Sequence, residues 1–372
     1  MPSSPSSPPT RITLGGGEPS AAVAQRVALA VAPALADGGL VVLPTETVYG
    51  IAARADSERA LAALTALKRR PAGQGWTWHV GSASALECFD APPAGASRLA
   101  ERFWPGALTL VLPGVPAGLE GAARDGWTGV RCVAHPLTAG LLEGLPYPVV
   151  MTSANERGAA PATGADAAAR VTGAGVDLLV DAGPAGGGAA SSVLRLGGGR
   201  FDLLREGELD LEVLRRAAGL RLAFACTGNT CRSPMAEGLA RQALARRLET
   251  DVERLWEFGF QLRSVGVFAG EGSPASANAV EACRARGIDI SSHRSRGAHA
   301  QELGDLQRVY CLTRAHLDAL RLLRPSTSEI ELELLDPNGE DVGDPIGGSL
   351  FEYQRCAEQI SGCIAARVGE WA

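Results

Sequence analysis

Short apolar segments alternate with amphipathic, helix-favouring segments along the first half of the chain. The run GLVVLP at 39–44 predicts a buried strand, and SERALAALTALKR at 57–69 predicts a helix capped by Ser57. Further apolar runs predict strands, at 107–113, 147–153 and 177–183. This alternation of strands and helices favours an α/β fold for a first block, residues 18–207.

The same alternation resumes after residues 208–219, which we interpret as a linker containing a connecting helix. A new strand beginning at Leu220 opens a second block, residues 220–372. The patterns in this block predict helices near 234–248, 274–286 and 349–369 and a strand near 308–313. The full length of 372 residues exceeds that of an ordinary single domain, so we expect two α/β domains.

The composition narrows the class of protein. Apolar residues make up 46% and charged residues 20%, which is enough to bury two cores. No apolar run reaches the roughly 18 residues of a membrane-spanning helix, so no membrane partner is expected. The start, MPSSPSSPPTR, lacks the basic and apolar regions of a secretory signal, and residues 1–17 are predicted to form a disordered tail. The eight cysteines show no disulfide spacing, which favours a reducing cytoplasm.

Charge is distributed unevenly between the two basic residue types. The net charge of −6 argues against a surface that coats nucleic acid. A local basic patch within this net charge is still compatible with the sequence. Lys68 is the only lysine among 35 basic residues, so the other 34 are arginines. A lone lysine suggests a site that requires a compact ammonium group. The alternative is that Lys68 is a chance residue on a solvated helix face.

The segment ACTGNTCRSP, residues 225–234, lies between an apolar strand and a helix-favouring stretch. A loop in this position points its backbone N–H groups, and the dipole of the helix, at an anion. Cys226 and Arg232 have C-x5-R spacing, and the helix start and the guanidinium both favour a thiolate. Arg232 can hold two phosphoryl oxygens, and Ser233 can donate to the sulfur. Gly228 and Asn229 suit positive φ or close backbone approach.

Phosphoryl transfer to a cysteine also requires an acid that protonates the leaving group. Asp344 and Asp336 both precede proline in loops near the end of the chain. Either Asp-Pro pair has a second interpretation as a plain turn.

Four segments of the second block together resemble the low-molecular-weight protein tyrosine phosphatase family, over essentially all of 220–372. These segments are residues 225–241, 264–269, 287–296 and 344–354. The resemblance implies a Rossmann-like four-stranded parallel sheet and a mechanism without a cofactor. It also implies Cys226 as nucleophile, Arg232 as phosphate binder and Asp344, rather than Asp336, as general acid. The phosphatase loop would further contain Thr227, Gly228, Asn229, Thr230, Cys231 and Ser233.

Two loop residues refine the expected chemistry. The sequence CTGNTCRS with DP-x-GGS resembles the bacterial protein-arginine phosphatase branch, in which the threonine at position 230 implies a preference for phosphoarginine over phosphotyrosine. Cys231 is either a small buried residue or a partner for a reversible disulfide with Cys226. No second Cys/His pair lies near Cys226 and Cys231 with zinc-ligand spacing, so no metal site is predicted.

The first block contains a series of polar turns that follow apolar strands. The stretch LPTETVYG at 43–50 offers Thr45 and Thr47, with a capped helix start as the alternative. Lys68 and Arg70 followed by Pro71 are typical of a phosphate clamp. Other candidates follow later strands: Arg131, His135, Ser153, Asn155, Ser191, Ser192 and Arg205.

In this order the motifs PTETVYG, K-x-RP, FWPG-x-LTLVL, VR-x3-HP and SAN-x2-G resemble the YrdC-like threonylcarbamoyl-AMP synthase family over about 20–210. The resemblance implies a twisted open α/β sheet and the formation of threonylcarbamoyl-AMP and pyrophosphate from ATP, bicarbonate and L-threonine, with Mg²⁺. The product would pass to a tRNA-modifying transferase. The nucleotide would be bound by Lys68, Arg70, Ser153, Asn155, Ser191 and Arg205, and threonine by Thr45, His79 and Arg131.

The first block also departs from this family pattern. The stretch AGQGWTWHV places Trp76 and Trp78 where the family has an apolar run, and Arg131 is followed by CVA rather than a proline-containing turn. We therefore carry two hypotheses. One is a bifunctional enzyme with synthase and phosphatase activities. The other keeps the phosphatase and makes the first block a nucleotide- or RNA-binding module that no longer catalyses.

Overall fold

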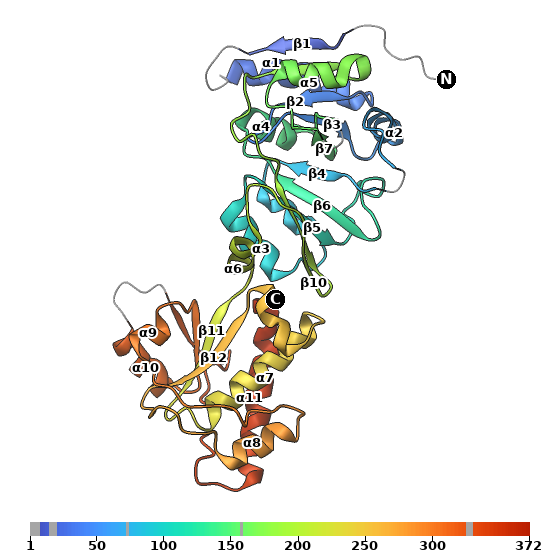
Figure 1. Cartoon of the computed structure of the whole chain (residues 1–372). Coiled ribbons are helices and arrows are strands. Elements are labelled where there is room, and N and C mark those ends of the chain that lie inside the picture. The colour runs from blue at the N-terminus through green and yellow to red at the C-terminus, as the bar shows by residue number, and fades with distance from the viewer. Residues whose placement is uncertain (1–7, 15–20, 72–73, 157–158, 325–329) are drawn as a thin grey trace. The chain divides into compact units, whose positions relative to one another are not determined.

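The computed structural model describes residues 8–14, 21–71, 74–156, 159–324 and 330–372. These residues form two compact units, Met1–Leu214 and Arg215–Ala372. Both units are mixed α/β structures, as the sequence predicts (Figure 1). The exact domain limits taken from the sequence, with a linker at 208–219, stay predictions. Helix α6 (Leu211–Ala218) lies within that segment.

Unit 1 is built on one sheet, which in the described residues has the strand order β1-β8-β2-β3-β7-β4-β6-β5-β9-β10. The strands are β1 (Thr10–Thr13), β2 (Val41–Leu43), β3 (Gly50–Arg54), β4 (Thr77–Val80), β5 (Leu108–Pro113), β6 (Trp127–Cys132), β7 (Val149–Ser153), β8 (Leu178–Asp181), β9 (Ser192–Gly197) and β10 (Arg200–Arg205). The helices are α1 (Ala21–Ala36), α2 (Glu58–Leu67), α3 (Ala94–Phe103), α4 (Pro136–Gly144) and α5 (Ala165–Thr172), with 3₁₀ turns at Ala83–Cys88 and Gly173–Gly175.

The sheet of unit 1 separates two apolar cores because side chains alternate along each strand. In β2, Val41 and Leu43 pack with α1 and α4, while Val42 packs on the opposite face with α2 and α5. Strand β7 repeats this arrangement, with Val149 and Met151 in the first core and Val150 in the second. Helices therefore cover both faces of this part of the sheet.

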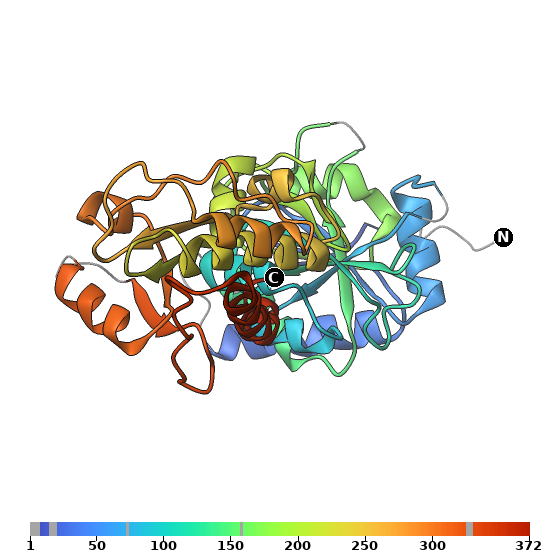
Figure 2. The same cartoon turned by 90° about the horizontal axis from the view of Figure 1, so that it is seen from below.

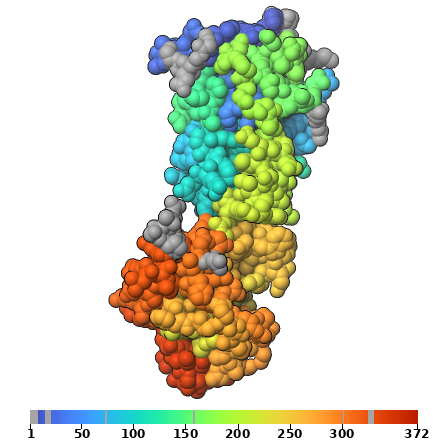
Figure 3. Space-filling view, turned by 60° about the vertical axis from the view of Figure 1, so that its left-hand side comes forward, coloured from blue at the N-terminus to red at the C-terminus, as the bar shows by residue number. Residues whose placement is uncertain are grey.

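Segments distant in sequence lie side by side at the other end of the sheet. Strand β5 pairs in parallel with β9, so that Thr109 is opposite Val193. Figure 3 shows the same neighbourhood at the surface, where cyan residues from the middle of unit 1 lie beside yellow-green residues from its end. This pairing brings Ser191, in the polar turn before β9, within 2.9 Å of Thr109 in β5.

Residues 10–13 correct the predicted disordered tail. They form β1, which pairs in parallel with β8, and Arg11 forms ion pairs of 2.6 Å with both Asp166 and Asp181. The ordering partners lie more than 150 residues away, so the local composition of the tail could not reveal them. The remaining parts of the predicted tail, 1–7 and 15–17, lie outside the described residues.

The predicted cap of the helix at 57–69 is confirmed. Ser57 caps α2 and accepts a hydrogen bond from the N–H of Ala60 at 3.3 Å. The alternative helix start at TETV is wrong, because residues 44–49 form the turn between β2 and β3, two antiparallel strands.

Unit 2 contains a four-stranded sheet in the order β12-β11-β13-β14, with every pair parallel, as the family resemblance implies. The strands are β11 (Arg221–Cys226), β12 (Gln261–Gly266), β13 (Arg308–Cys311) and β14 (Glu331–Leu334). The helices are α7 (Arg232–Arg247), α8 (Ala277–Arg284), α9 (Ala300–Leu303), α10 (Arg314–Leu323) and α11 (Leu350–Trp371), with a 3₁₀ segment at Val252–Phe258. Figure 2 shows α7, in yellow, beside α11, in red.

Alternation along β11 again assigns residues to two cores. Ala223 and Ala225 pack in a cluster with Leu317 and Leu320 of α10, while Phe224 contacts Trp371 of α11 on the other face. All four strands are parallel, so their carboxyl ends share one edge of the sheet. The loops that follow Cys226, Gly266, Cys311 and Leu334 therefore meet at that edge.

Candidate active sites

The loop after β11 begins with Cys226 and leads directly into α7 at Arg232. Asn229 has a φ of +52°, as expected for a residue that tolerates the left-handed region. Gly228 does not have positive φ, and an added Cβ would meet only the Thr230 hydroxyl, at 3.7 Å. Asn229 therefore provides the sharp turn of the loop, and Gly228 leaves room beside it.

Hydrogen bonds fix Asn229 on three sides. Its Nδ2 donates to Ser233 Oγ at 2.9 Å, its Oδ1 accepts from the N–H of Arg296 at 2.9 Å, and its carbonyl bonds His293 Nε2 at 2.7 Å. Asn229 is completely buried. These contacts offset the cost of its left-handed backbone and hold the loop in one shape.

The Cys226 sulfur lies 3.0 Å from Ser233 Oγ. Ser233 is itself buried and also donates to the Val265 carbonyl at 3.3 Å. The hydroxyl has a single proton, so it donates to a thiolate at Cys226 by turning that proton from the Val265 carbonyl to the sulfur while its oxygen stays in place.

Arg232 is 5% exposed, and its guanidinium reaches the second Asp-Pro loop. Nη2 donates to Asp344 Oδ2 at 2.6 Å, and Nη1 donates to the Val342 carbonyl at 3.4 Å. Asp336 instead accepts the N–H of Asn338 at 2.7 Å in a local turn. The fold thus brings Asp344 to Arg232, and Asp336 makes the plain turn that was its alternative interpretation.

The remaining loop residues contact neighbouring elements. Cys231 Sγ lies 3.2 Å from the Tyr353 hydroxyl and 3.4 Å from Ser276 Oγ. Thr230 Oγ1 lies 3.7 Å from the same sulfur. Both Cys226 and Cys231 are free thiols. The Cys231 thiol is therefore held among hydroxyl groups rather than in a purely apolar site.

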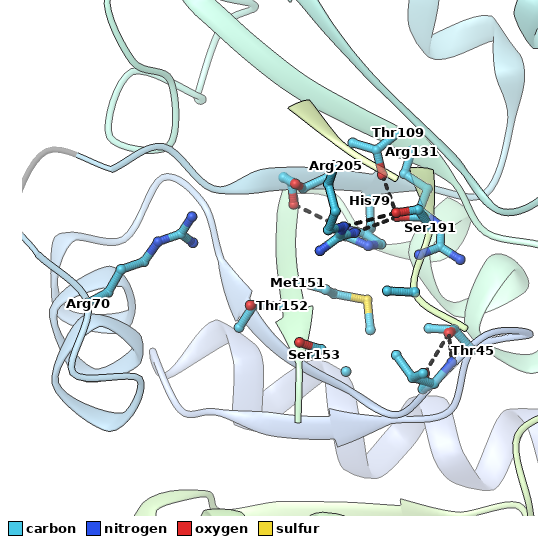
Figure 4. A pocket seen from close by; sticks show the side chains of 14 residues that line it. Thr45, Arg70, His79, Thr109, Arg131, Met151, Thr152, Ser153, Ser191 and Arg205 are labelled. Atoms are coloured by element: carbon cyan, nitrogen blue, oxygen red, sulfur yellow. Dashed lines mark hydrogen bonds between the residues drawn. The ribbon is translucent and has the colours of Figure 1, made fainter. Parts of the chain in front are cut away.

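A second polar pocket lies in unit 1, over the centre of the sheet (Figure 4). Seven predicted residues line it: Thr45, Arg70, His79, Arg131, Ser153, Ser191 and Arg205. Val48, Gly50, Thr77, Thr109, Met151, Thr152 and Ala190 complete the lining. Three guanidinium groups and no carboxylate are among these residues, so the pocket favours an anion.

Arg131 is buried and already engaged by neighbouring groups. Nη2 donates to Glu46 Oε1 at 2.5 Å and to Thr47 Oγ1 at 2.8 Å, and Nε donates to the Gly106 carbonyl at 3.1 Å. Burial by itself raises the pKa of Glu46, but the charge and hydrogen bond of Arg131 lower it, and the net pKa lies below the ordinary value. Glu46 therefore stays ionised and partly neutralises Arg131.

Thr45 shapes the turn beside this ion pair. Its hydroxyl donates to the Val48 carbonyl at 2.5 Å and accepts the Val48 N–H at 3.1 Å. It also lies 3.0 Å from the Thr47 hydroxyl. The threonines of the turn thus hold Glu46 opposite Arg131.

Arg205 and Ser191 form a second polar cluster in the pocket. Arg205 donates from Nε to the Ser191 carbonyl at 3.0 Å and from Nη2 to Ser191 Oγ at 2.9 Å. Ser191 Oγ is also 2.9 Å from Thr109 Oγ1. Burial, and then the nearby charge of Arg131, lowers the pKa of Arg205 below its ordinary value. Two repelling cations held in one pocket favour an anionic occupant.

Lys68 and Asn155 lie next to the pocket rather than in its lining. Lys68 Nζ donates to the Ser153 carbonyl at 2.8 Å and to the Asn155 carbonyl. Ser153 Oγ donates to Asn155 Oδ1. Burial, and then the Arg70 charge, lowers the pKa of Lys68. The lone lysine thus joins the end of α2 to the turn after β7.

Arg70 approaches the pocket from the opposite side to Arg131 and Arg205 (Figure 4). Its Nε donates to Gln74 Oε1 at 2.9 Å, and its guanidinium lies 4.2 Å from the ring centroid of Trp76. Trp76, one of the departures from the family pattern, therefore supports an arginine of the site.

His79 is 8% exposed and reaches the pocket from β4. Burial, and then the Arg131 charge, lowers its pKa to about 3. The neutral ring donates from Nδ1 to the Thr77 carbonyl at 2.9 Å, which leaves Nε2 as an acceptor. His79 can therefore accept a hydrogen bond from a bound amino or hydroxyl group.

The donor set of the pocket does not fit a resident Mg²⁺ ion. Mg²⁺ prefers carboxylate and phosphate oxygens, whereas the lining has three guanidinium groups and Glu46 is bound to Arg131. Within the described ranges, no group of three or more His, Cys, Asp or Glu side chains could hold a metal ion. Among the helices of the same ranges, none combines the length and apolar character needed to cross a membrane.

Comparison with known proteins assigns each half of the chain to a family. The Sua5_yciO_yrdC family model, described as Telomere recombination, matches residues 33–207, and the model for low molecular weight phosphotyrosine protein phosphatase matches residues 221–366. A putative threonylcarbamoyl-AMP synthase of Mycobacterium tuberculosis is 36% identical over 51% of this chain and 88% of its own length. A protein-arginine-phosphatase of Geobacillus stearothermophilus is 31% identical over 39% of this chain and 90% of its own length. The chain belongs to both families.

Unit 1 therefore contains the Sua5/YrdC domain and unit 2 the phosphatase domain, and both resemblances found in the sequence are confirmed. A threonylcarbamoyl-AMP synthase of Bacillus subtilis is 34% identical over 53% of this chain. The chain spans only 56% of the length of that relative.

The two sites contain residues that sequence reasoning missed. Glu46 holds Arg131, Tyr353 and Ser276 contact Cys231, and His316 contacts the phosphatase loop. Glu46 lies inside the PTETVYG motif, so the motif pointed to this segment as part of the site. It did not indicate that Glu46 would pair with Arg131. Tyr353 lies in the motif that carries Asp344, but no spacing rule links it to Cys231.

Proposed function

We propose that unit 1 synthesises threonylcarbamoyl-AMP from ATP, bicarbonate and L-threonine. The observation that carries this proposal is the pocket of unit 1, in which three guanidinium groups face a shared space without a carboxylate in the lining. Such a pocket suits a triphosphate and neutralises the charge on the departing pyrophosphate. Membership of the Sua5/YrdC family supports the same reaction.

The pocket residues, together with Lys68 and Asn155 beside the pocket, divide between the two substrates. Lys68, Arg70 and Arg205 would neutralise the triphosphate, and Ser153, Asn155 and Ser191 would bind phosphate and sugar oxygens. Thr45 and His79 would bind the polar atoms of threonine. Arg131 would bind the threonine carboxylate only if it shared its guanidinium with Glu46. The site needs no covalent nucleophile, because it works by bringing the carbamate and the α-phosphorus together.

Pyrophosphate release tests this activity. The purified chain should release pyrophosphate from ATP only when both threonine and bicarbonate are present. ATP binding without this release would favour the alternative, a nucleotide- or RNA-binding module that no longer catalyses. Mg²⁺ would enter with ATP rather than as a resident ion, since the pocket offers no carboxylate ligands.

We propose that unit 2 is a cysteine-dependent protein phosphatase. Two contacts at the start of α7 carry this proposal: the Cys226 sulfur lies 3.0 Å from Ser233 Oγ, and Arg232, the residue before Ser233, donates to the Asp344 carboxylate at 2.6 Å. The thiolate would attack phosphorus, forming an S–P bond as the P–N or P–O bond to the substrate breaks. Asp344 would give its proton to the leaving nitrogen or oxygen, and water would then hydrolyse the S–P bond to release phosphate and the thiolate.

Phosphoarginine is the substrate that we propose, with phosphotyrosine as the second candidate. Thr230 supports this choice, as does the similarity to a protein-arginine-phosphatase over 90% of that relative. The test compares turnover of phosphoarginine and of a phosphotyrosine peptide by the wild type and by Thr230→Ile. Loss of the arginine preference in the variant is expected, and an unchanged preference would count against the assignment.

The proposed partners follow from the two reactions. The adenylate would pass to a tRNA-modifying transferase, and the phosphatase would act on phosphoproteins. We place both activities in the cytoplasm, where the eight free cysteines would stay reduced.

A further inference from the structure

His316 lies in α10, behind the phosphatase loop, and no motif in the sequence marks it. It is 4% exposed. Its Nε2 is 2.9 Å from Thr227 Oγ1, and its Nδ1 is 2.9 Å from Thr313 Oγ1, the N-cap of the same helix. Both ring nitrogens are therefore committed to hydroxyl groups, one in the phosphatase loop and one in α10.

The ring is neutral under physiological conditions. Burial, and then the charge of Arg232, lowers the pKa of His316 to about 4. A neutral imidazole has one donor and one acceptor nitrogen, and a hydroxyl can act in either role. The chain Thr313–His316–Thr227 can therefore be satisfied without a charge beside the phosphate site.

The start of α10 also holds the loop that carries Asp344. The N–H of Arg314 donates to Asp341 Oδ1 at 2.8 Å, and the N–H of Val342 donates to the Leu312 carbonyl at 2.8 Å. Asp341 and Val342 lie within three residues of Asp344. Residues 312–316 thus contact the nucleophile loop on one side and the general-acid loop on the other.

We infer that His316 is a positioning residue that, through Thr227, holds the nucleophile loop in register with the loop that carries Asp344. This inference rests on the proposed phosphatase function. In-line attack and protonation of the leaving group need the sulfur and the carboxylate on opposite sides of one phosphorus atom. A small shift between the two loops therefore affects the chemical step more than substrate binding.

Two matched pairs of variants test this role. Thr227→Val removes the hydroxyl that His316 contacts, whereas Thr227→Ser keeps it. His316→Asn can place a polar atom near Thr313 but not near Thr227, whereas His316→Gln can reach Thr227. The measurements are kcat and KM for p-nitrophenyl phosphate, the Kd of vanadate, and the melting temperature of each full-length variant.

We expect Thr227→Val and His316→Asn each to lower kcat by about tenfold or more, with KM and vanadate affinity nearly unchanged. Thr227→Ser and His316→Gln should keep most of the wild-type kcat. Thr227→Val and His316→Asn break the same contact. The double variant that carries these two substitutions should therefore be no slower than the slower of the two single variants. Thr227 is exposed, so Thr227→Val should leave the fold intact. Its kcat therefore tests the contact even if substitutions at His316 destabilise the fold.

Three results would overturn the inference. Wild-type kcat in both Thr227→Val and His316→Asn would show that the contact has no role in turnover. Multiplicative losses in the double variant would show that the two residues act separately. An inactive wild type would reject the proposed phosphatase function itself, and the inference with it, before any variant is compared.

Discussion

Arg232 donates from Nη2 to Asp344 Oδ2 at 2.6 Å, across a separation of 112 residues in the chain. The two residues have different proposed roles, as phosphate binder and general acid. Their contact holds the Asp344 loop beside the guanidinium that we propose as the phosphate binder. The Asp344 side chain is 42% exposed, so it can also exchange protons with water.

Asp344→Asn should lower kcat by about 10²- to 10⁴-fold for a phenyl phosphate, because the leaving oxygen then lacks a proton donor. The loss should be much smaller for p-nitrophenyl phosphate, whose leaving group needs less protonation. Asp336→Asn is the matched control, since Asp336 also precedes proline but contacts Asn338 in its own turn and the Cys363 thiol rather than Arg232. Equal losses with both substrates would instead indicate a general distortion of the loop.

Glu46→Gln should destabilise unit 1, because it leaves the buried Arg131 guanidinium without its anionic partner. We expect the free energy of unfolding at pH 7 to fall by about 1–3 kcal/mol. The measurement is urea unfolding monitored by circular dichroism. The transition that belongs to unit 2 is identified from the loss of p-nitrophenyl phosphate turnover. Glu101→Gln, on the exposed side of α3, is the control and should change little.

The effect of Glu46→Gln should also depend on pH. The pKa of Glu46 is lowered in the folded state, so its contribution to stability is complete above the ordinary value of 4.5 and is lost as the pH falls through the folded-state value. The difference between wild type and variant should therefore be largest near neutral pH and shrink under acid conditions. A difference that is constant with pH would mean that the carboxylate charge is not what stabilises the unit.

Arg70→Ala should weaken ATP binding by unit 1, because it removes one of the three guanidinium groups that line the pocket. We expect the Kd for ATP to rise by about tenfold or more, which corresponds to about 1.4 kcal/mol. Isothermal titration of the full chain measures this value. Arg59→Ala, at the other end of α2, is the control, and an equal effect of both substitutions would show that only net charge matters.

Cys231→Ser should make the phosphatase activity easier to destroy by hydrogen peroxide. If Cys231 forms a disulfide with oxidised Cys226, the wild type recovers its activity with dithiothreitol, whereas the variant proceeds to irreversible sulfinic acid. The measurement is the recovered fraction of activity after matched peroxide exposure. Cys88→Ser, which removes an exposed thiol in unit 1, should recover like the wild type.

Local sequence patterns predicted the elements that local physics controls. The apolar run before Cys226 forms β11, the stretch after it forms α7, and Ser57 caps α2. These features depend on side-chain periodicity and capping within a few residues, so the order of residues alone specifies them. The sequence also separated the candidate residues into two groups, one in each half of the chain.

Contacts between distant segments could not be deduced in this way. Residues 10–13 look disordered by composition but form β1 beside β8. Local patterns did not separate Asp344 from Asp336; the family resemblance chose Asp344, and the structure brings it to Arg232. Glu46 and His316 are ordinary polar residues until folding brings them against Arg131 and Thr227. Sequence by itself determined the strand–loop–helix units and the residue types for phosphate chemistry. The tertiary structure decided which of them meet, because strand pairing and burial act between residues that no local pattern connects.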